Sequence, residues 1–275
     1  MRLTEPMSRH FDQALVVEPE RRGSVAWSQF NEHYHRLQLE PWSHINRGTD
    51  HPWHRRLRRL VMAWFIQRTG ALLDLTRKAR IISRFPLPRD PDIVFFGAEV
   101  GWEAVLVQAL FGAGGRVVLV DCDPMAYRRY QEAPRELEVA APRGFGQKTL
   151  TLRRDPARIE YVQADFFDWG EAAAFDVGID WGLLEHYPGP RKRAVMARFQ
   201  HCLRDGGQQI TAVPRDSLPT RSFYRTFSDE LNFGYRELAS LDELAATLED
   251  GGFEVIERVA TSTTCVALAR VTRRH

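Results

Sequence analysis

Two aspartates, Asp121 and Asp165, are placed where their carboxylates could bind a nucleoside. Each follows a short apolar segment typical of a buried strand, "RVVLV" at 116–120 and "IEYVQ" at 159–163. A carboxylate at the end of such a strand can accept hydrogen bonds from both hydroxyls of a ribose, the role expected of Asp121. Asp165 could accept the exocyclic amine of an adenine. The alternative role for either aspartate is a helix N-cap, which is common.

A third apolar segment, 92–96, runs into the glycine-containing sequence "GAEVG". Gly97 and Gly101 would let the backbone approach a ligand closely, and the helix expected after them would offer free N–H groups. The dinucleotide pattern G-x-G-x-x-G is not met, because Glu99 occupies its second position. A pyrophosphate is therefore disfavoured at this loop, and with it an NAD-dependent oxidoreductase.

The elements that must position these residues alternate between strand and helix from about residue 92 onward. Further strands are expected at 175–179, 208–213, 253–260 and 264–271, and helices at 101–111, 190–207 and 240–252. Gly206 and Gly207 would end the second helix, and a Ser240/Glu243 capping box would begin the third. This alternation predicts a doubly wound, mostly parallel α/β sheet, which binds ligands at the carboxyl ends of its strands.

The N-terminal third of the chain differs from the rest. Residues 1–88 are rich in Trp, His and Arg, with helices expected near 27–38 and 52–80. Residues 1–90 carry 16 Lys and Arg against 9 Asp and Glu, so this part is basic. We interpret residues 1–88 as a helical cap on the substrate side and residues 89–275 as a Rossmann-like core. The pattern of residues 134–158 does not decide between loop and secondary structure.

Composition limits the class of protein. The 275 residues are 44% hydrophobic, enough for one well-cored domain with an accessory element or for two small domains. The three cysteines are far apart and show no metal-binding spacing. The N-terminal sequence lacks the apolar run of a signal peptide, and no segment is apolar enough to span a bilayer. We therefore expect a cytoplasmic protein that does not associate with membranes.

Four segments together resemble the class I (Rossmann-like) S-adenosylmethionine-dependent methyltransferases. They are "VFFGAEVG", "VVLVDCDP", "VQADFFDW" and "FDVGIDWGLLEHYPGPRKRAVMARFQHCLRDGGQQITAVP". The resemblance covers roughly residues 90–275, and the last segment is the most specific. It implies a seven-stranded sheet closed by an antiparallel hairpin. It also implies S-adenosyl-L-methionine as cofactor and S-adenosyl-L-homocysteine as product.

The resemblance also implies a set of cofactor-binding residues. Gly97, Ala98 and Gly101 would hold the methionyl part, Asp121 the ribose, Cys122, Asp165 and Phe166 the adenine, and Asp180 and Trp181 would lie beside the amino-acid end. Two positions depart from the family, which commonly has an acid at Phe95 and a glycine at Glu99. One interpretation is a degenerate site that no longer binds. We prefer a site in which Glu99 pairs with the ammonium group of the zwitterionic cofactor.

Methyl transfer is an in-line displacement at a sulfonium carbon, so the protein mainly aligns the nucleophile and excludes water. A hydroxyl or protonated nitrogen acceptor needs a general base as well, and His186 in "LLEHY" is the candidate. The alternative is a histidine that only packs the turn, with Glu185 orienting it or capping the next helix. Some relatives hold a metal with an E-x-x-E-H run, but Gly182 occupies its first acidic position, so no metal is expected.

The acceptor-binding candidates come from the cap and from residues 220–235. They are Tyr34, His35, Trp53, His54 and Tyr224. Their aromatic character suits a planar or apolar molecule, so we expect a small aromatic or heteroaromatic acceptor, as in specialised metabolism. The Asn/Asp-Pro-Pro-aromatic signature of nucleobase methylation is absent, so nucleic acid is not the expected partner. Two alternatives stay open: an RNA methyltransferase that grips phosphates with its basic cap, and a non-catalytic binding module.

Overall fold

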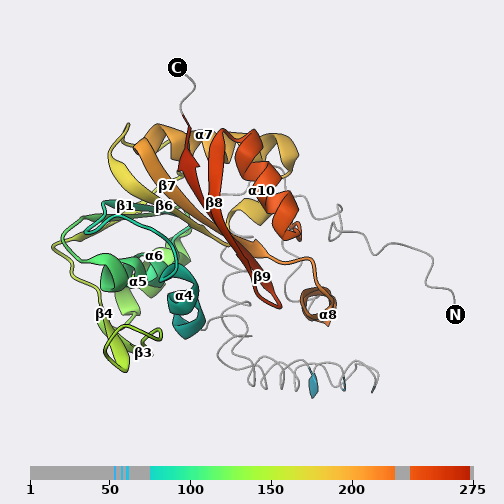
Figure 1. The fold of residues 1–275 in the computed structure, drawn as a ribbon, viewed down its shortest axis with the longest axis horizontal. Coiled ribbons are helices and arrows are strands. Elements are labelled where there is room, and N and C mark those ends of the chain that lie inside the picture. Colours follow the sequence, from blue (N-terminus) through green and yellow to red (C-terminus); the bar gives the residue numbers. More distant parts are fainter. Residues whose placement is uncertain (1–52, 54–56, 58–59, 62–74, 227–235, 273–275) are drawn as a thin grey trace, which may run out of the picture.

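The computed structural model describes residues 53, 57, 60, 61, 75–226 and 236–272. Its main sheet has seven strands in the order β5-β2-β1-β6-β7-β9-β8 (Figure 1). These strands are β1 (Ile93–Phe96), β2 (Val117–Asp121), β5 (Ile159–Gln163), β6 (Phe175–Trp181), β7 (Leu203–Pro214), β8 (Phe253–Ala260) and β9 (Thr264–Val271). The first five in the order are parallel, and β9 is antiparallel to both its neighbours. The predicted seven-stranded, mostly parallel sheet is confirmed.

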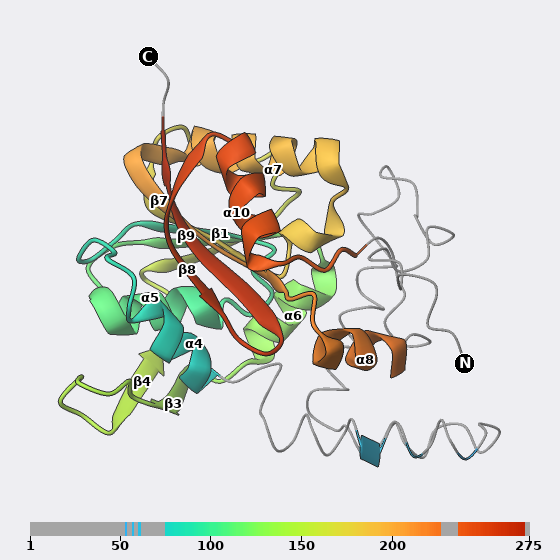
Figure 2. The same cartoon turned by 45° about the vertical axis from the view of Figure 1, so that its right-hand side comes forward.

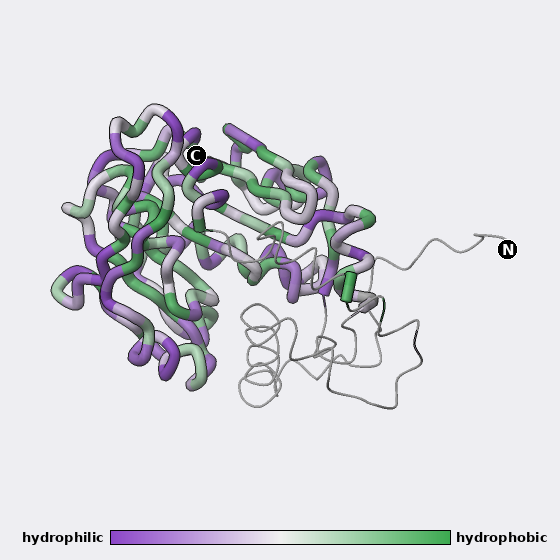
Figure 3. The backbone as a smooth tube through the Cα atoms, turned by 90° about the horizontal axis from the view of Figure 1, so that it is seen from below, coloured by the Kyte–Doolittle hydropathy of each residue, from purple (hydrophilic) through white to green (hydrophobic). Residues whose placement is uncertain are grey.

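Helices cover both faces of this sheet, as a doubly wound fold requires (Figures 1 and 2). The helical elements are α4 (Leu75–Ile82), α5 (Trp102–Phe111), α6 (Pro124–Glu132), η3 (Leu184–His186), α7 (Gly189–Cys202), α8 (Leu218–Thr226) and α10 (Leu241–Asp250). Side chains of a strand alternate between faces. Ile93 and Phe95 of β1 therefore pack in the core beneath α4 and α5, whereas Val94 and Phe96 pack beneath α7 and α10. The hydrophobic segments of the tube in Figure 3 mark this interior.

The predicted capping box of α10 is present, because Glu243 N donates to Ser240 Oγ at 3.2 Å and Ser240 N donates to Glu243 Oε2 at 2.8 Å. The predicted end of α7 is wrong. The helix ends at Cys202 rather than at Gly206, because Leu203 turns to an extended conformation and pairs with Phe175 of β6. Burial in the sheet therefore ends the helix before the glycines are reached.

The undecided insertion between α6 and β5 forms a separate antiparallel hairpin of β3 (Glu136–Ala140) and β4 (Thr149–Arg153). Alternate residues of the hairpin face inward, and Leu150 and Leu152 are buried in the same core cluster as α5. Figure 2 shows the hairpin beside α4 and α5. The insertion thus covers one face of the sheet-packed helices.

The proposed cap lies mostly outside the described residues. Within it, Trp53, Leu57, Leu60 and Val61 are helical, and α4 begins at Leu75. The division at residue 88 therefore stays a prediction. Among the residues that the structure describes, no helix is both long and apolar enough to cross a membrane.

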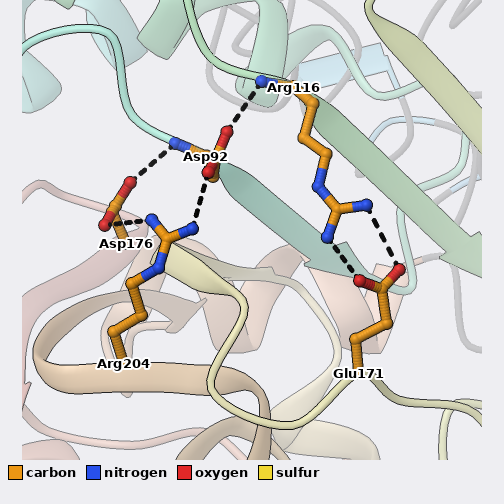
Figure 4. A network of polar contacts seen from close by, with 5 residues as sticks. All are labelled: Asp92, Arg116, Glu171, Asp176 and Arg204. Atoms are coloured by element: carbon orange, nitrogen blue, oxygen red, sulfur yellow. Dashed lines mark hydrogen bonds and ion pairs between the residues drawn. The ribbon is translucent and has the colours of Figure 1, made fainter.

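An ion network joins the amino ends of the strands, at the edge opposite the predicted site (Figure 4). The guanidinium of Arg204 donates to Asp176 Oδ1 at 2.6 Å and to Asp92 Oδ2 at 2.8 Å. Asp92 also accepts the backbone N–H of Arg116 at 3.0 Å, and Arg116 pairs with Glu171. The network ties β1, β2, β6 and β7 together where each strand begins.

The network predicts a modest stabilisation that acid removes. Replacing Arg204 with Gln leaves two carboxylates without their shared cation, so the free energy of unfolding should fall by about 1 kcal/mol, since the groups are partly solvated. Partial burial raises the pKa of Asp92, but the N–H of Arg116 and the Arg204 guanidinium outweigh it and lower that pKa. The contribution is therefore present above pH ~4, the unfolded value, and fades at lower pH.

Urea titrations of wild type and Arg204→Gln at pH 7 and pH 3 measure this difference. Arg258→Gln is the matched control, because Arg258 pairs with the well-exposed Asp242. A loss in the control equal to that of Arg204→Gln, or a difference that grows at pH 3, would contradict the network's role.

Candidate functional site

The predicted ligand-binding residues meet at one edge of the sheet. Phe96 pairs with Val120 of β2 on one side and with Asp180 of β6 on the other, and Asp121 pairs with Gln163 of β5. These strands are parallel, so their carboxyl ends share this edge. The strand order reverses between β1 and β6, which is the switch point where open α/β sheets bind ligands.

The loop after β1 has a backbone that requires its glycines. Gly97 and Gly101 have φ angles of +66° and +81°, which side chains with a Cβ rarely adopt. A Cβ on Gly101 would lie 2.4 Å from Leu119 Cδ1. Glu99, between them, is also left-handed at φ +48°, and such strain in a residue with a Cβ is typical of functional sites.

Asp121 connects this loop to the segment after β2. Its Oδ2 accepts the backbone N–H of Glu99 and its Oδ1 accepts that of Asp123, both at 2.9 Å. Burial raises the pKa of Asp121 to about 6, and the charges of Asp123 and Glu99 add to the rise that the two N–H donors oppose. A carboxylate oxygen can accept more than one hydrogen bond, so each Asp121 oxygen can still accept one from a hydroxyl.

The Glu99 carboxylate is held by an arginine that the sequence did not single out. Arg129 Nη1 of α6 lies 3.1 Å from Glu99 Oε1. Nearby, Lys78 of α4 pairs with Glu103 of α5, and the Lys78 ammonium lies 4.9 Å from the centre of the Trp181 ring. No spacing in the sequence marks Lys78 or Arg129, because both reach the loop from helices distant in the chain. Glu99 therefore already has one cation beside it.

Cys122 lies between the acidic groups of two neighbouring strand ends. Burial, together with the charges of Asp121 and Asp165, raises the pKa of its thiol to about 12. The thiol is therefore neutral at pH 7 and has no tendency to act as a nucleophile. The ends of β2 and β5 lie side by side, because Asp121 pairs with Gln163 in the parallel sheet.

The loop after β5 exposes the Asp165 carboxylate, whereas the Phe166 ring is buried. Asp165 is exposed, and its Oδ1 accepts the N–H of Phe167 at 2.9 Å. The Phe166 ring is buried, with its centroid 5.0 Å from that of Phe96 and 4.3 Å from that of Phe167. The Phe166 ring thus packs in the core against Phe96, and its predicted contact with an adenine stays a prediction. Arg198 of α7 holds the loop by donating to the Phe166 carbonyl at 3.2 Å.

Asp180 and Trp181 end β6 beside the glycine loop. Asp180 is fully buried, and its Oδ1 accepts the N–H groups of Leu183 at 3.0 Å and Leu184 at 3.2 Å, which caps η3. Burial and the charge of Glu185 raise the pKa of Asp180 well above its usual range. A Cβ on Gly97 would lie 3.1 Å from Leu183 Cδ1, so η3 abuts the glycine loop directly.

His186 and Tyr224 are brought together by Arg236. The His186 side chain is buried in η3, with Nε2 3.4 Å from Arg236 Nη2 and 3.8 Å from Glu185 Oε1. The same guanidinium lies 4.5 Å from the centre of the buried Tyr224 ring of α8. Two of the predicted residues thus belong to one buried polar cluster, and Arg236 is a member that the sequence did not reveal.

The remaining acceptor candidates are not brought into this cluster by the described structure. Tyr34, His35 and His54 lie outside the described residues, and the Trp53 side chain is 76% exposed. Within the described part of the chain, no three His, Cys, Asp or Glu side chains are placed to hold a metal ion.

The loop geometry predicts unequal costs for two glycine substitutions. Gly101→Ala combines a left-handed φ, worth about 1–2 kcal/mol, with overpacking against Leu119, worth about 1–3 kcal/mol. Gly144→Ala in the β3–β4 turn has φ +93° but no described atom within 4 Å of the new Cβ, so only the first cost applies. Thermal unfolding should show a clearly larger loss for Gly101→Ala, and equal losses would refute the close approach.

No protein-family model and no curated protein matches the sequence. Solved structures do match in fold. The S-adenosylmethionine-dependent methyltransferase SibL matches at 16% identity and a TM-score of 0.51, over 80% of this chain and 59% of its own. An O-methyltransferase family 2 protein from Planctomyces limnophilus, in complex with apigenin, matches at 13% and 0.54, over 78% and 62%. This chain therefore spans less than two thirds of the length of those two proteins.

Human N-acetylserotonin methyltransferase, in complex with S-adenosylmethionine, matches at 14% identity and a TM-score of 0.52. The match covers 90% of this chain and 67% of the human one. The strand order with its antiparallel β9, the glycine loop at the switch point and these matches agree with one another. The chain has the class I, Rossmann-like fold of S-adenosylmethionine-dependent methyltransferases.

Proposed function

We propose that this chain is an S-adenosylmethionine-dependent methyltransferase that acts on a small aromatic or heteroaromatic acceptor. The observation that carries the proposal is the hydrogen bond between the glycine loop and Asp121 beside the switch point, with Asp165 following the neighbouring strand β5. Support for a small acceptor comes from two matched proteins, one solved with apigenin and one named for N-acetylserotonin. Both of these molecules are aromatic.

The charge at this edge of the sheet favours a cationic ligand over a phosphate. Glu99, Asp121, Asp123 and Asp165 surround the loops, and each raises the pKa of an acidic neighbour. A pyrophosphate would be repelled by these acids. A cofactor that carries a sulfonium and an ammonium group would be attracted by them.

The residues present fit such a cofactor. The backbone of Gly97, Ala98 and Gly101 would lie against its methionyl part, which the absence of Cβ atoms at the two glycines permits. Asp121 would accept the ribose hydroxyls and Asp165 the adenine amine, with Cys122 and the backbone of Phe166 at the edge of the base. Asp180 and Trp181 would lie near the amino-acid end. Glu99 would share its carboxylate between Arg129 and the ammonium group.

When bound, the cofactor supplies an activated methyl group, and the chain's own residues must orient the acceptor and exclude water. His186 stays our candidate base. Glu185 Oε1 lies 3.8 Å from His186 Nε2 and would orient the imidazole. The buried position of both residues would keep bulk water from the reacting atoms.

Asp121→Asn tests the cofactor site. The amide cannot make charge-assisted bonds to ribose hydroxyls, so the affinity for S-adenosylhomocysteine should fall by about 10-fold or more. Isothermal titration calorimetry measures this loss. Glu171→Gln, at the opposite edge of the sheet, is the control and should bind as tightly as wild type. Absence of binding by the wild type would refute the proposed function itself.

The same site predicts a pH dependence. The pKa of Asp121 is raised to about 6, and the ionised carboxylate is the better acceptor of ribose hydroxyls. The affinity for S-adenosylhomocysteine should therefore be constant above pH ~7 and should fall by up to about tenfold per unit below pH 6. Asp121→Asn should lose most of this dependence. An unchanged pH profile in the variant would assign the titration to another group.

Transfer of a labelled methyl group from S-adenosylmethionine tests the reaction. We expect label on members of a panel of small phenols, indoles and aromatic amines, and none on bulk RNA. Labelled RNA, together with binding that weakens steeply as salt rises, would instead favour the RNA methyltransferase alternative. Cofactor binding without transfer to any acceptor would favour a binding module.

A further inference from the structure

Two buried carboxyl groups beside the proposed cofactor site each have an oxygen without a hydrogen-bond donor. They are Oδ2 of Asp180 and Oε2 of Glu185, and the two side chains are 0% and 5% exposed. Buried carboxyl oxygens are usually satisfied, because leaving one without a donor costs free energy. Two such atoms, in buried residues close enough for the charge of Glu185 to raise the pKa of Asp180, therefore indicate a missing partner.

The basic groups around the pair are already engaged with other residues. Lys192 of α7 donates to Glu237 Oε2 at 2.7 Å. Arg236 lies against His186 and the Tyr224 ring. These cations lower the pKa of Glu185, but burial outweighs them and raises it to about 7. The missing partner is thus a hydrogen-bond donor or a cation that the described residues do not provide.

The two residues contact different segments, Asp180 the strand before the glycine loop and Glu185 the segment after α8. Asp180 pairs with Phe96, the residue before the glycine loop. The neighbours of Glu185 come from the other direction: Glu237 N donates to the Glu185 carbonyl at 2.9 Å, which fixes the segment after α8 on η3. Glu185 therefore joins η3 to the segment that follows α8.

The backbone beside Glu185 leaves room for a ligand group. Gly182 has φ +89°, and among the described atoms a Cβ there would have only Glu185 Oε1 within 4 Å, at 3.6 Å. A position for one methyl group, beside Gly182 and Glu185 Oε1, is thus not filled by the described side chains.

We propose that Asp180 and Glu185 bind an amino group of the methyl acceptor, and this assignment rests on the proposed function. A protonated amine offers several N–H donors and a positive charge, which would satisfy Asp180 Oδ2 and Glu185 Oε2 together. The methionyl ammonium of the cofactor has the same chemistry, so the experiment must separate the two sources. The acceptor class is then an arylalkyl amine, which is protonated at pH 7, rather than a neutral phenol.

Amine binding should also release a proton. Burial raises the pKa of both carboxyl groups, that of Glu185 to about 7, so burial favours their protonated forms when no cation is present. A bound ammonium favours the ionised carboxylates and expels a proton. Titrations in phosphate and in MOPS, whose ionisation enthalpies differ and which carry no primary amine, measure the protons released. Release of no proton at pH 7 would contradict the assignment.

The decisive experiment uses the full chain saturated with S-adenosylhomocysteine. Arylalkyl primary amines and their hydroxyl isosteres are titrated in pairs: benzylamine and benzyl alcohol, 2-phenylethylamine and 2-phenylethanol, tryptamine and tryptophol. Wild type should bind the amine of at least one pair about 10-fold more tightly than the alcohol, the gain of one charge-assisted bond. Glu185→Gln should lose this preference and keep its affinity for S-adenosylhomocysteine. Glu171→Gln, at the opposite edge of the sheet, is the control and should keep both.

Each other outcome overturns the proposal in a distinct way. No amine preference in wild type, or the same preference in Glu185→Gln, would remove the acceptor site. Loss of S-adenosylhomocysteine affinity in Glu185→Gln with the amine preference intact would assign the pair to the cofactor ammonium. Absence of S-adenosylhomocysteine binding by wild type would be a failure of the proposed function. The proton-release measurement on wild type decides the matter if the variant does not fold.

Discussion

The carboxylate of Asp121 is the contact on which the rest of the site depends. It accepts the N–H groups of Glu99 and Asp123, and so it fixes the left-handed loop after β1 to the start of α6. The ion pair of Arg129 with Glu99 adds a second link between the same two segments. The same carboxylate raises the pKa of the neighbouring Cys122, and its own pKa is raised by the charges of Asp123 and Glu99. One side chain therefore sets both the geometry and the negative potential of the proposed cofactor site.

The two edges of the sheet have different tasks. At the amino ends, every acid of the Asp92, Asp176 and Arg204 network has a cation, which suits a region that only holds strands together. At the carboxyl ends, Asp180 and Glu185 keep oxygens without donors. Such groups reduce stability and are retained where a ligand uses them. The acids at the amino ends of the strands thus serve the stability of the sheet, and those at the carboxyl ends are available to a ligand.

The sequence predicted the fold well because its signals are local. Apolar strands, the Ser240 capping box and the glycine loop each depend on a few neighbouring residues, and all were found. What it could not predict depends on contacts between distant segments. The stacking of the Phe166 ring on Phe96, which comes from another strand, is one such contact. Arg129, Lys78 and Arg236 enter the site from helices or loops whose spacing carries no mark, and α7 ends early because Leu203 pairs with β6.

The central claim is that the loops after β1, β2 and β5 form one nucleoside-binding site for a cationic methyl donor. A crystal structure of the complex with S-adenosylhomocysteine tests it most directly. The account predicts ribose hydroxyls on Asp121, the adenine amine on Asp165, the methionyl part along Gly97–Gly101, and the ring of Phe166 still stacked on Phe96. Density for the ligand elsewhere, or an adenine that displaces Phe166 from the core, would contradict it.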